Sequence, residues 1–151
     1  DPDAFATLQA FHPAAAGYSE PLSSVHLYPT GRWTRIHVPL PKGLEREGVA
    51  LRLDPCNFAG TVMIAALTLK ECSSRQPVWS ARPPGLAGVW HMGGTAQFVS
   101  ESDHCMTLRS TGNDPQICLR VEVVPDELRG RADLEAEIWL HTTAASSTAG
   151  R

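Results

Sequence analysis

The stretch GRWTRIHVPLP, residues 31–41, decides the fold class of this chain. Its residues alternate in character, which is the period-two pattern of a half-buried β-strand. One face carries Thr34, Ile36, Val38 and Leu40, and the other carries Trp33, Arg35 and His37. We therefore expect the aliphatic face to lie on a core and the tryptophan-bearing face to point away from it.

Similar short segments flank this strand in both directions. The nearly continuous apolar run at 61–69 predicts a central strand covered on both faces. The turn-forming residues 110–115 predict a hairpin between 105–109 and 116–124, and alternation at 134–141 predicts a closing strand. About eight strands without a long amphipathic helix predict an all-β, two-sheet antiparallel β-sandwich of jelly-roll type.

The two ends differ in composition from the middle. Residues 1–24 are rich in Ala, Pro and Ser, and the spacing of Phe5, Leu8 and Phe11 favours a helical turn or an irregular arm. The final ten residues are mostly Ala, Ser and Thr. The sequence thus predicts an N-terminal arm packed on the domain (1–24), a β-sandwich domain (25–141) and a disordered linker or tail (142–151).

Composition and charge exclude several classes of partner. The chain is 42% hydrophobic and 19% charged, which is typical of a globular protein. Its formal net charge is −3 and its 13 Lys and Arg residues form no run, which argues against nucleic acid and against an anionic membrane surface. The four cysteines favour reduced thiols in a cytoplasmic protein, with a Cys105–Cys118 disulfide as the alternative.

Motifs for catalysis, cofactors and metals are not evident. The cysteines form no C-x-x-C pair and the six histidines form no H-x-H pair, although calcium held by aspartates stays an alternative. Adjacent strand residues face opposite ways, so His104 is poorly placed to activate Cys105. Glu135 and Glu137 share one strand face and do not bracket a glycosidic bond. We expect no enzyme activity, no cofactor and no metal, with a small hydrolase as a weaker alternative.

Three motifs together resemble a known group of domains. They are GRWTRIHVPLP at 31–41, LRLDP at 51–55 and STGNDP at 110–115. They are similar to β-sandwich accessory domains, like carbohydrate-binding modules, found beside glycosyltransferase or methyltransferase domains of bacterial cell-surface polysaccharide enzymes. The resemblance spans about residues 18–141 and implies a non-catalytic, carbohydrate-binding-like domain with a catalytic neighbour in the same chain.

The candidate binding residues come from strand parity and loop position. Tryptophan stacks well on the apolar face of a sugar ring, and charged side chains bind its hydroxyls. The candidates on strand faces are Trp33, Arg35, Arg52, Asp54 and Trp139, and the candidates around the loop at 82–85 are Trp79, Arg82 and Trp90. The competing interpretations are a face covered by the N-terminal arm, an Arg52–Asp54 ion pair that fixes a strand end, and a small core under the loop.

These patterns predict a domain that binds a glycan or polysaccharide, or positions it for an adjacent catalytic domain. The alternative is a protein-interaction or structural spacer module without a sugar ligand. Exposed coplanar indole rings favour the first function, whereas buried indoles with an apolar patch elsewhere favour the second.

Overall fold

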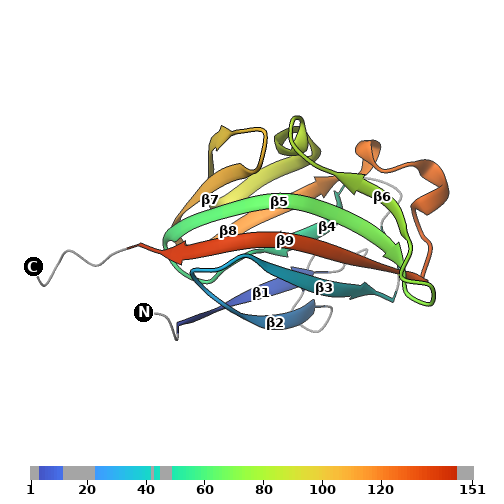
Figure 1. The fold of residues 1–151 in the computed structure, drawn as a ribbon, viewed down its shortest axis with the longest axis horizontal. Helices are drawn as coiled ribbons and strands as arrows, with labels where there is room; N and C mark the ends of the chain where they lie inside the picture. The colour runs from blue at the N-terminus through green and yellow to red at the C-terminus, as the bar shows by residue number, and fades with distance from the viewer. Residues whose placement is uncertain (1–3, 12–22, 42, 45–48, 146–151) are drawn as a thin grey trace, which may run out of the picture.

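The computed structural model describes residues 4–11, 23–41, 43–44 and 49–145, and β-strands dominate it (Figure 1). The strands are β1 Phe5–Phe11, β2 Ser23–Pro29, β3 Thr34–Leu40, β4 Val49–Asp54, β5 Gly60–Glu71, β6 Pro77–Ala81, β7 Trp90–Glu101, β8 Met106–Arg120 and β9 Leu134–Ala144. Short 3₁₀ helices lie between strands: η2 Leu86–Val89 between β6 and β7, and η3 Val121–Val123 and η4 Asp126–Leu128 between β8 and β9. Among the described residues, no helix is both long enough and apolar enough to cross a lipid bilayer.

All strand pairs are antiparallel, and they join into one curled sheet. The order is β2-β1-β4-β8-β5-β9-β3, with β6 paired to β5 and β7 paired to β8. The sheet is nearly closed, so that its outline is barrel-like (Figure 1). The all-β prediction is confirmed, with nine strands instead of about eight. The two-sheet jelly-roll arrangement is a finer prediction that this pairing does not confirm.

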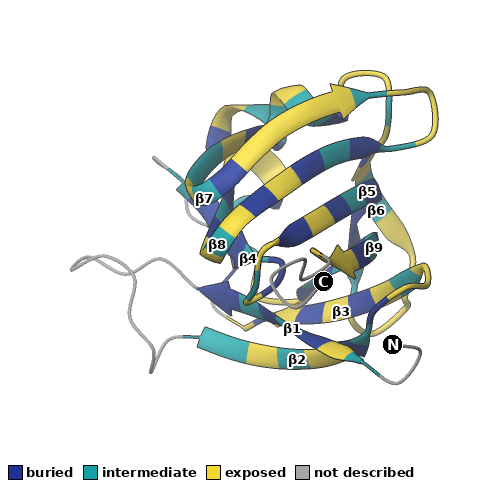
Figure 2. Ribbon diagram, turned by 90° about the vertical axis from the view of Figure 1, so that its left-hand side faces the viewer, coloured by how far each residue is buried: buried dark blue, intermediate teal, exposed yellow. Residues whose placement is uncertain are grey.

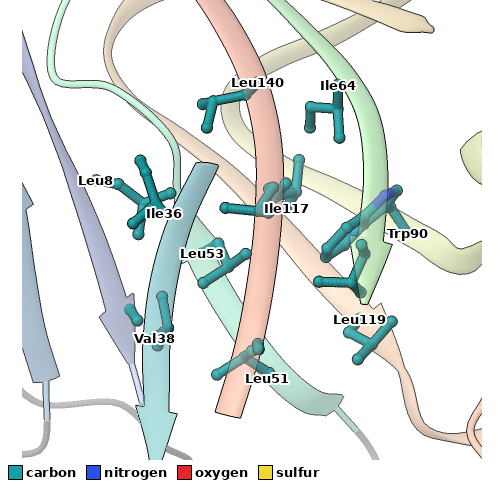
Figure 3. Packing of buried hydrophobic residues seen from close by; sticks show 14 of the residues in the cluster. Leu8, Ile36, Val38, Leu51, Leu53, Ile64, Trp90, Ile117, Leu119 and Leu140 are labelled. Carbon is teal, nitrogen blue, oxygen red and sulfur yellow. The ribbon is translucent and has the colours of Figure 1, made fainter. Parts of the chain in front are cut away.

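The core fills the inside of the curled sheet. Aliphatic side chains from neighbouring strands meet there, including Leu8, Ile36, Leu53, Ile117 and Leu140 (Figure 3). Each is at most 6% exposed, and burial of one such side chain stabilises the fold by about 1.5–3 kcal/mol. Bands of buried and exposed residues alternate along the strands (Figure 2). The alternation predicted for β3 is therefore confirmed.

The N-terminal segment differs from its prediction. Where the sequence favoured a helical turn or an irregular arm, Phe5–Phe11 forms β1, paired with β2 and β4. Its inward face consists of Ala6, Leu8 and Ala10, all fully or almost fully buried. The helical spacing of the larger apolar residues was misleading, because two neighbouring strands supply the hydrogen-bond partners that make this segment extended.

The predicted hairpin at 110–115 is wrong, because β8 runs through this segment without reversing. Ser110 stands opposite Ala96 of β7, and Pro115 stands opposite Gly94, so that residues 111–114 face Thr95 alone. The Thr95 hydroxyl accepts a hydrogen bond from the Asp114 amide at 3.2 Å. The turn-forming residues therefore make a β-bulge, with four residues of β8 opposite one residue of β7, because β7 pairs with β8 on both sides of this segment.

Strand β7 passes through the glycine pair at 93–94 without interruption. Gly94 has φ +57°, and a Cβ on it would lie 2.0 Å from the Asp114 carbonyl oxygen. Glycine is therefore required at position 94 of β7, where the bulged residues of β8 lie against it. At the other end of the chain, β9 extends to Ala144, three residues beyond the predicted strand. The rest of the expected tail, 146–151, lies outside the described residues, as do residues 12–22 of the expected arm.

Candidate functional site

The candidate site is a pocket of about 390 Å³ on the outer side of the sheet. It forms where β9 lies between β5 and β3, strands that run side by side in Figure 1. Its lining residues are Trp33, Ala65, Arg82, Pro83, Asp103, His104 and Trp139. They come from five separate segments, so only the folded chain assembles this site.

Two indole rings form one side of the pocket. The ring centroids of Trp33 and Trp139 are 5.6 Å apart and their planes make an angle of 61°. Trp33 meets His141 with the same centroid distance and angle. Trp33 is 41% exposed, whereas Trp139 is half-buried. Such edge-to-face contacts are favourable between aromatic rings, and they leave the Trp33 ring accessible to a ligand.

Strand register explains why these rings meet. Arg35 of β3 is the direct partner of Trp139 on β9, and Trp33 lies two residues before Arg35 on the same outward face. On the other side of β9, a β-bulge between Ile64 and Ala66 places the extra residue Ala65 beside Trp139. The small side chain at this bulge leaves a hollow beside the indole.

Two loops also line the pocket. The first, after β6, contributes Arg82 and Pro83, and the second, between β7 and β8, contributes Asp103 and His104. The Glu101 carboxylate accepts hydrogen bonds from the amides of Gly85 at 3.1 Å and Ala87 at 2.9 Å.

This carboxylate ties the first loop to the end of β7. Within the second loop, the Ser102 hydroxyl accepts hydrogen bonds from the amides of His104 and Cys105. Both loops are therefore held by side-chain contacts to the backbone.

A charged cluster lies further along the same three strands. Glu137 of β9 contacts Lys70 of β5 and His37 of β3, each at 2.7 Å from its Oε2 atom. Burial would raise the pKa of Glu137, but the hydrogen bonds with Lys70 and His37 outweigh it, so that its pKa is below the ordinary value. The Glu137 charge is thus already neutralised by its neighbours.

Two predicted site residues form an ion pair elsewhere on the sheet. Arg52 donates two hydrogen bonds of 2.9 Å to Asp54, and its guanidinium lies 4.3 Å from the centre of the Phe11 ring. Burial raises the pKa of Asp54 more than the ion pair lowers it. This pair belongs to β4, which β8 and β5 separate from β9. The competing interpretation, an ion pair on the strand, is confirmed.

The predicted loop cluster of Trp79, Arg82 and Trp90 does not form as a unit. Trp90 is only 2% exposed and belongs to the main core (Figure 3). It contributes to a different cavity of about 520 Å³, which Met92, Phe98 and Arg120 also line. Trp79 is half-buried on β6 and packs against the core. Proximity in sequence misplaced this cluster, because Trp79 lies on β6, which pairs with β5, whereas Trp90 begins β7, which pairs with β8.

Sequence reasoning missed part of the pocket. His104 was considered only as a neighbour of Cys105, Ala65 only as part of a buried strand, and Asp103 was not among the candidates. Asp103 and His104 lie at a chain reversal, and Ala65 lies at a strand irregularity. These positions indicate a pocket only when the strand pairing is known. Within the described ranges, no three His, Cys, Asp or Glu side chains are grouped so as to hold a metal ion.

Fold and site together define this chain as an all-β protein that carries an aromatic-walled, charged pocket on the outer face of its sheet. Comparison with protein-family models, curated proteins and solved structures finds no match.

Proposed function

We propose that this chain is a non-catalytic carbohydrate-binding or substrate-positioning domain, and that its ligand occupies the pocket beside Trp33 and Trp139. The observation that carries this proposal is the combination in one cavity of accessible indole surface with guanidinium, carboxylate and imidazole groups. An indole face stacks on the C–H surface of a pyranose, and the polar groups bind its hydroxyls.

The sequence resemblance supports the same proposal and extends it. It implies a β-sandwich accessory domain that acts beside a glycosyltransferase or methyltransferase domain of a bacterial polysaccharide enzyme, and the jelly-roll type expected from the number of strands belongs to the same proposal. A binding domain of this kind raises the local concentration of a polysaccharide near its catalytic neighbour in the same chain. A cytoplasmic location belongs to the proposal and is supported by the four cysteines, each of which is a free thiol.

An array of bacterial polysaccharides tests the proposal, with the wild type, Trp33→Ala and Phe98→Ala compared on every bound glycan. Phe98 is a matched control because it is 50% exposed and lines the other cavity. An aromatic contact contributes about 0.5–1.5 kcal/mol, so Trp33→Ala should weaken binding about threefold to tenfold. Phe98→Ala should bind as the wild type does. A wild type that binds no glycan, or equal losses in both variants, contradicts the proposal.

One observation favours the alternative of a protein-interaction module. Phe5, Val25 and Leu27 are 55–69% exposed and share the outer face of the paired strands β1 and β2. If this apolar strip is the functional surface, the protein segment bound on it shields β2 from solvent. Leu27→Asp will then weaken this contact and increase the hydrogen exchange of the β2 amides. Trp33→Ala will leave that exchange unchanged.

A further inference from the structure

The lining of the pocket also points to the kind of sugar. This step rests on the proposed function, because it concerns the ligand of the same pocket. We infer that the pocket takes a single sugar unit that carries a carboxylate, and that Arg82 binds this carboxylate.

The shape of the pocket favours one sugar unit over an extended chain. A flat polysaccharide surface stacks on rings that share a plane, whereas the Trp33 and Trp139 planes differ by 61°. The two loops that carry Arg82 and His104 line the same pocket as the two rings. A volume of about 390 Å³ lies near the lower end of the range for small-molecule sites.

Unpaired positive charge gathers at this pocket. Five of the nine arginines that the structure describes form ion pairs with carboxylates. For the other four, no such pair is found among the described residues, and two of these, Arg35 and Arg82, lie at the pocket. Arg35 already rests on the Trp139 ring, so Arg82 is the guanidinium available to a ligand. Its planar donors fit a carboxylate through two parallel hydrogen bonds.

The carboxylates around the pocket leave this charge largely uncompensated. Glu101 is occupied by the Gly85 and Ala87 amides, and Glu137 is occupied by Lys70 and His37. Asp103 is the acidic residue of the lining, and it faces the ligand together with His104. An acidic sugar therefore places its carboxylate toward Arg82, and Asp103 accepts hydrogen bonds from the hydroxyls on the other side of the ring.

Matched pairs of sugars test this inference, because their members differ only in the carboxylate. The probes are methyl glucuronide with methyl glucoside and methyl galacturonide with methyl galactoside, titrated into the full chain and followed by the indole N–H resonances of Trp33 and Trp139. We expect one acidic sugar to bind about tenfold more tightly than its neutral partner. Arg82→Gln should remove most of this preference. Arg109→Gln should keep it, since Arg109 is exposed and lines a separate pocket.

The outcomes separate this inference from the proposed function. If neutral and acidic sugars bind equally well at the two indoles, or if Arg82→Gln keeps the preference, the acidic ligand is overturned and sugar binding stands. If no sugar of either pair shifts the Trp33 and Trp139 resonances, the inference is overturned, and the polysaccharide array decides whether the proposed function stands. A preference that Arg109→Gln also removes is a general charge effect and overturns the role of Arg82.

Discussion

Arg35 and Trp139 are direct partners on β3 and β9, and the guanidinium carbon of Arg35 lies 4.7 Å from the centre of the Trp139 ring. One face of this indole is therefore covered by a cation. Because Trp33 meets the same ring edge-on and is more exposed, Trp33 offers the larger free surface for stacking. Arg35 and Trp33 both contact the Trp139 ring, so the energetic coupling between Arg35 and Trp139 can be measured by substitution.

Arg35→Gln removes the cation above Trp139 while keeping a polar side chain. Exposed cation–π contacts contribute about 0.5–1 kcal/mol, and we expect a loss of this size in the free energy of unfolding. A double-mutant cycle with Trp139→Ala, measured by urea denaturation, should give a coupling energy of the same magnitude. Additive effects of the two substitutions would show that the contact contributes nothing.

Glu101→Ala should loosen the loop that carries Arg82. The carboxylate satisfies two backbone amides before and within η2, and loss of such a cap costs about 0.5–2 kcal/mol. Hydrogen exchange at Gly85 and Ala87 should accelerate, and ligand affinity should fall while the β-sheet stays protected. Glu127→Ala, at an exposed position on η4, is the control and should change neither quantity.

Glu137 should make stability depend on pH in the acid range. Its folded-state pKa is lowered, so its contribution is complete above the ordinary pKa and is lost as the pH falls through the lowered value. Glu137→Gln should cost about 1 kcal/mol at neutral pH, and the gap to the wild type should narrow as the pH falls below the ordinary pKa of a glutamate.

Denaturant titrations at several pH values measure this gap for Glu137→Gln and for Glu122→Gln. Glu122 is exposed and 3.9 Å from Arg120, so its variant should stay within about 0.5 kcal/mol of the wild type. A gap for Glu137→Gln that stays constant down to the acid limit would show that the contacts with Lys70 and His37 do not favour its ionised form.

The cysteines should react in the order of their exposure. Burial raises the pKa of the Cys56 and Cys118 thiols, and the reactive thiolate is correspondingly scarce. Cys72 is exposed and Cys105 is half-buried. A thiol-exchange reagent should label Cys72 first, and Cys56 only after denaturant is added. Early labelling of Cys56 in the native protein would contradict its buried position.

Trp90 and Trp33 should differ sharply in their effect on stability. Trp90 is enclosed by the core, so Trp90→Ala should cost about 3–5 kcal/mol of the free energy of unfolding, whereas Trp33→Ala should cost less than about 1 kcal/mol.

The Trp90 Nε1 has no hydrogen-bond partner among the described residues. An unpaired buried N–H is unfavourable by about 1–3 kcal/mol, so Trp90→Phe should be much milder than Trp90→Ala. Equal losses in the two Trp90 variants would show that this N–H is satisfied.

Local pattern was enough to predict several parts of the molecule. Alternation located β3 and most of β9, and it placed Trp33, Arg35 and Trp139 correctly on the outward side. The spacing of Arg52 and Asp54 was enough to predict their ion pair. These features depend on residues next to one another on a single strand, where the side-chain period is fixed by covalent geometry.

Long-range pairing decided the rest. The segment 110–115 has the composition of a reversal, yet β7 pairs with β8 on both sides of it, β5 pairs before it and β4 pairs after it. Phe5–Phe11 became a strand because β2 and β4 supply its partners. In both cases, inter-strand hydrogen bonds and core burial outweighed the local preference.

By itself, the sequence determined that this chain is all-β and that β3 turns indole and guanidinium groups outward. Only the tertiary structure decided that Arg82, Asp103 and His104 line a pocket together with Trp33 and Trp139. The physical reason is that alternation along one strand fixes the side of the sheet on which a residue lies. Which strands lie next to each other, and which loops meet above them, is set by pairing between distant segments.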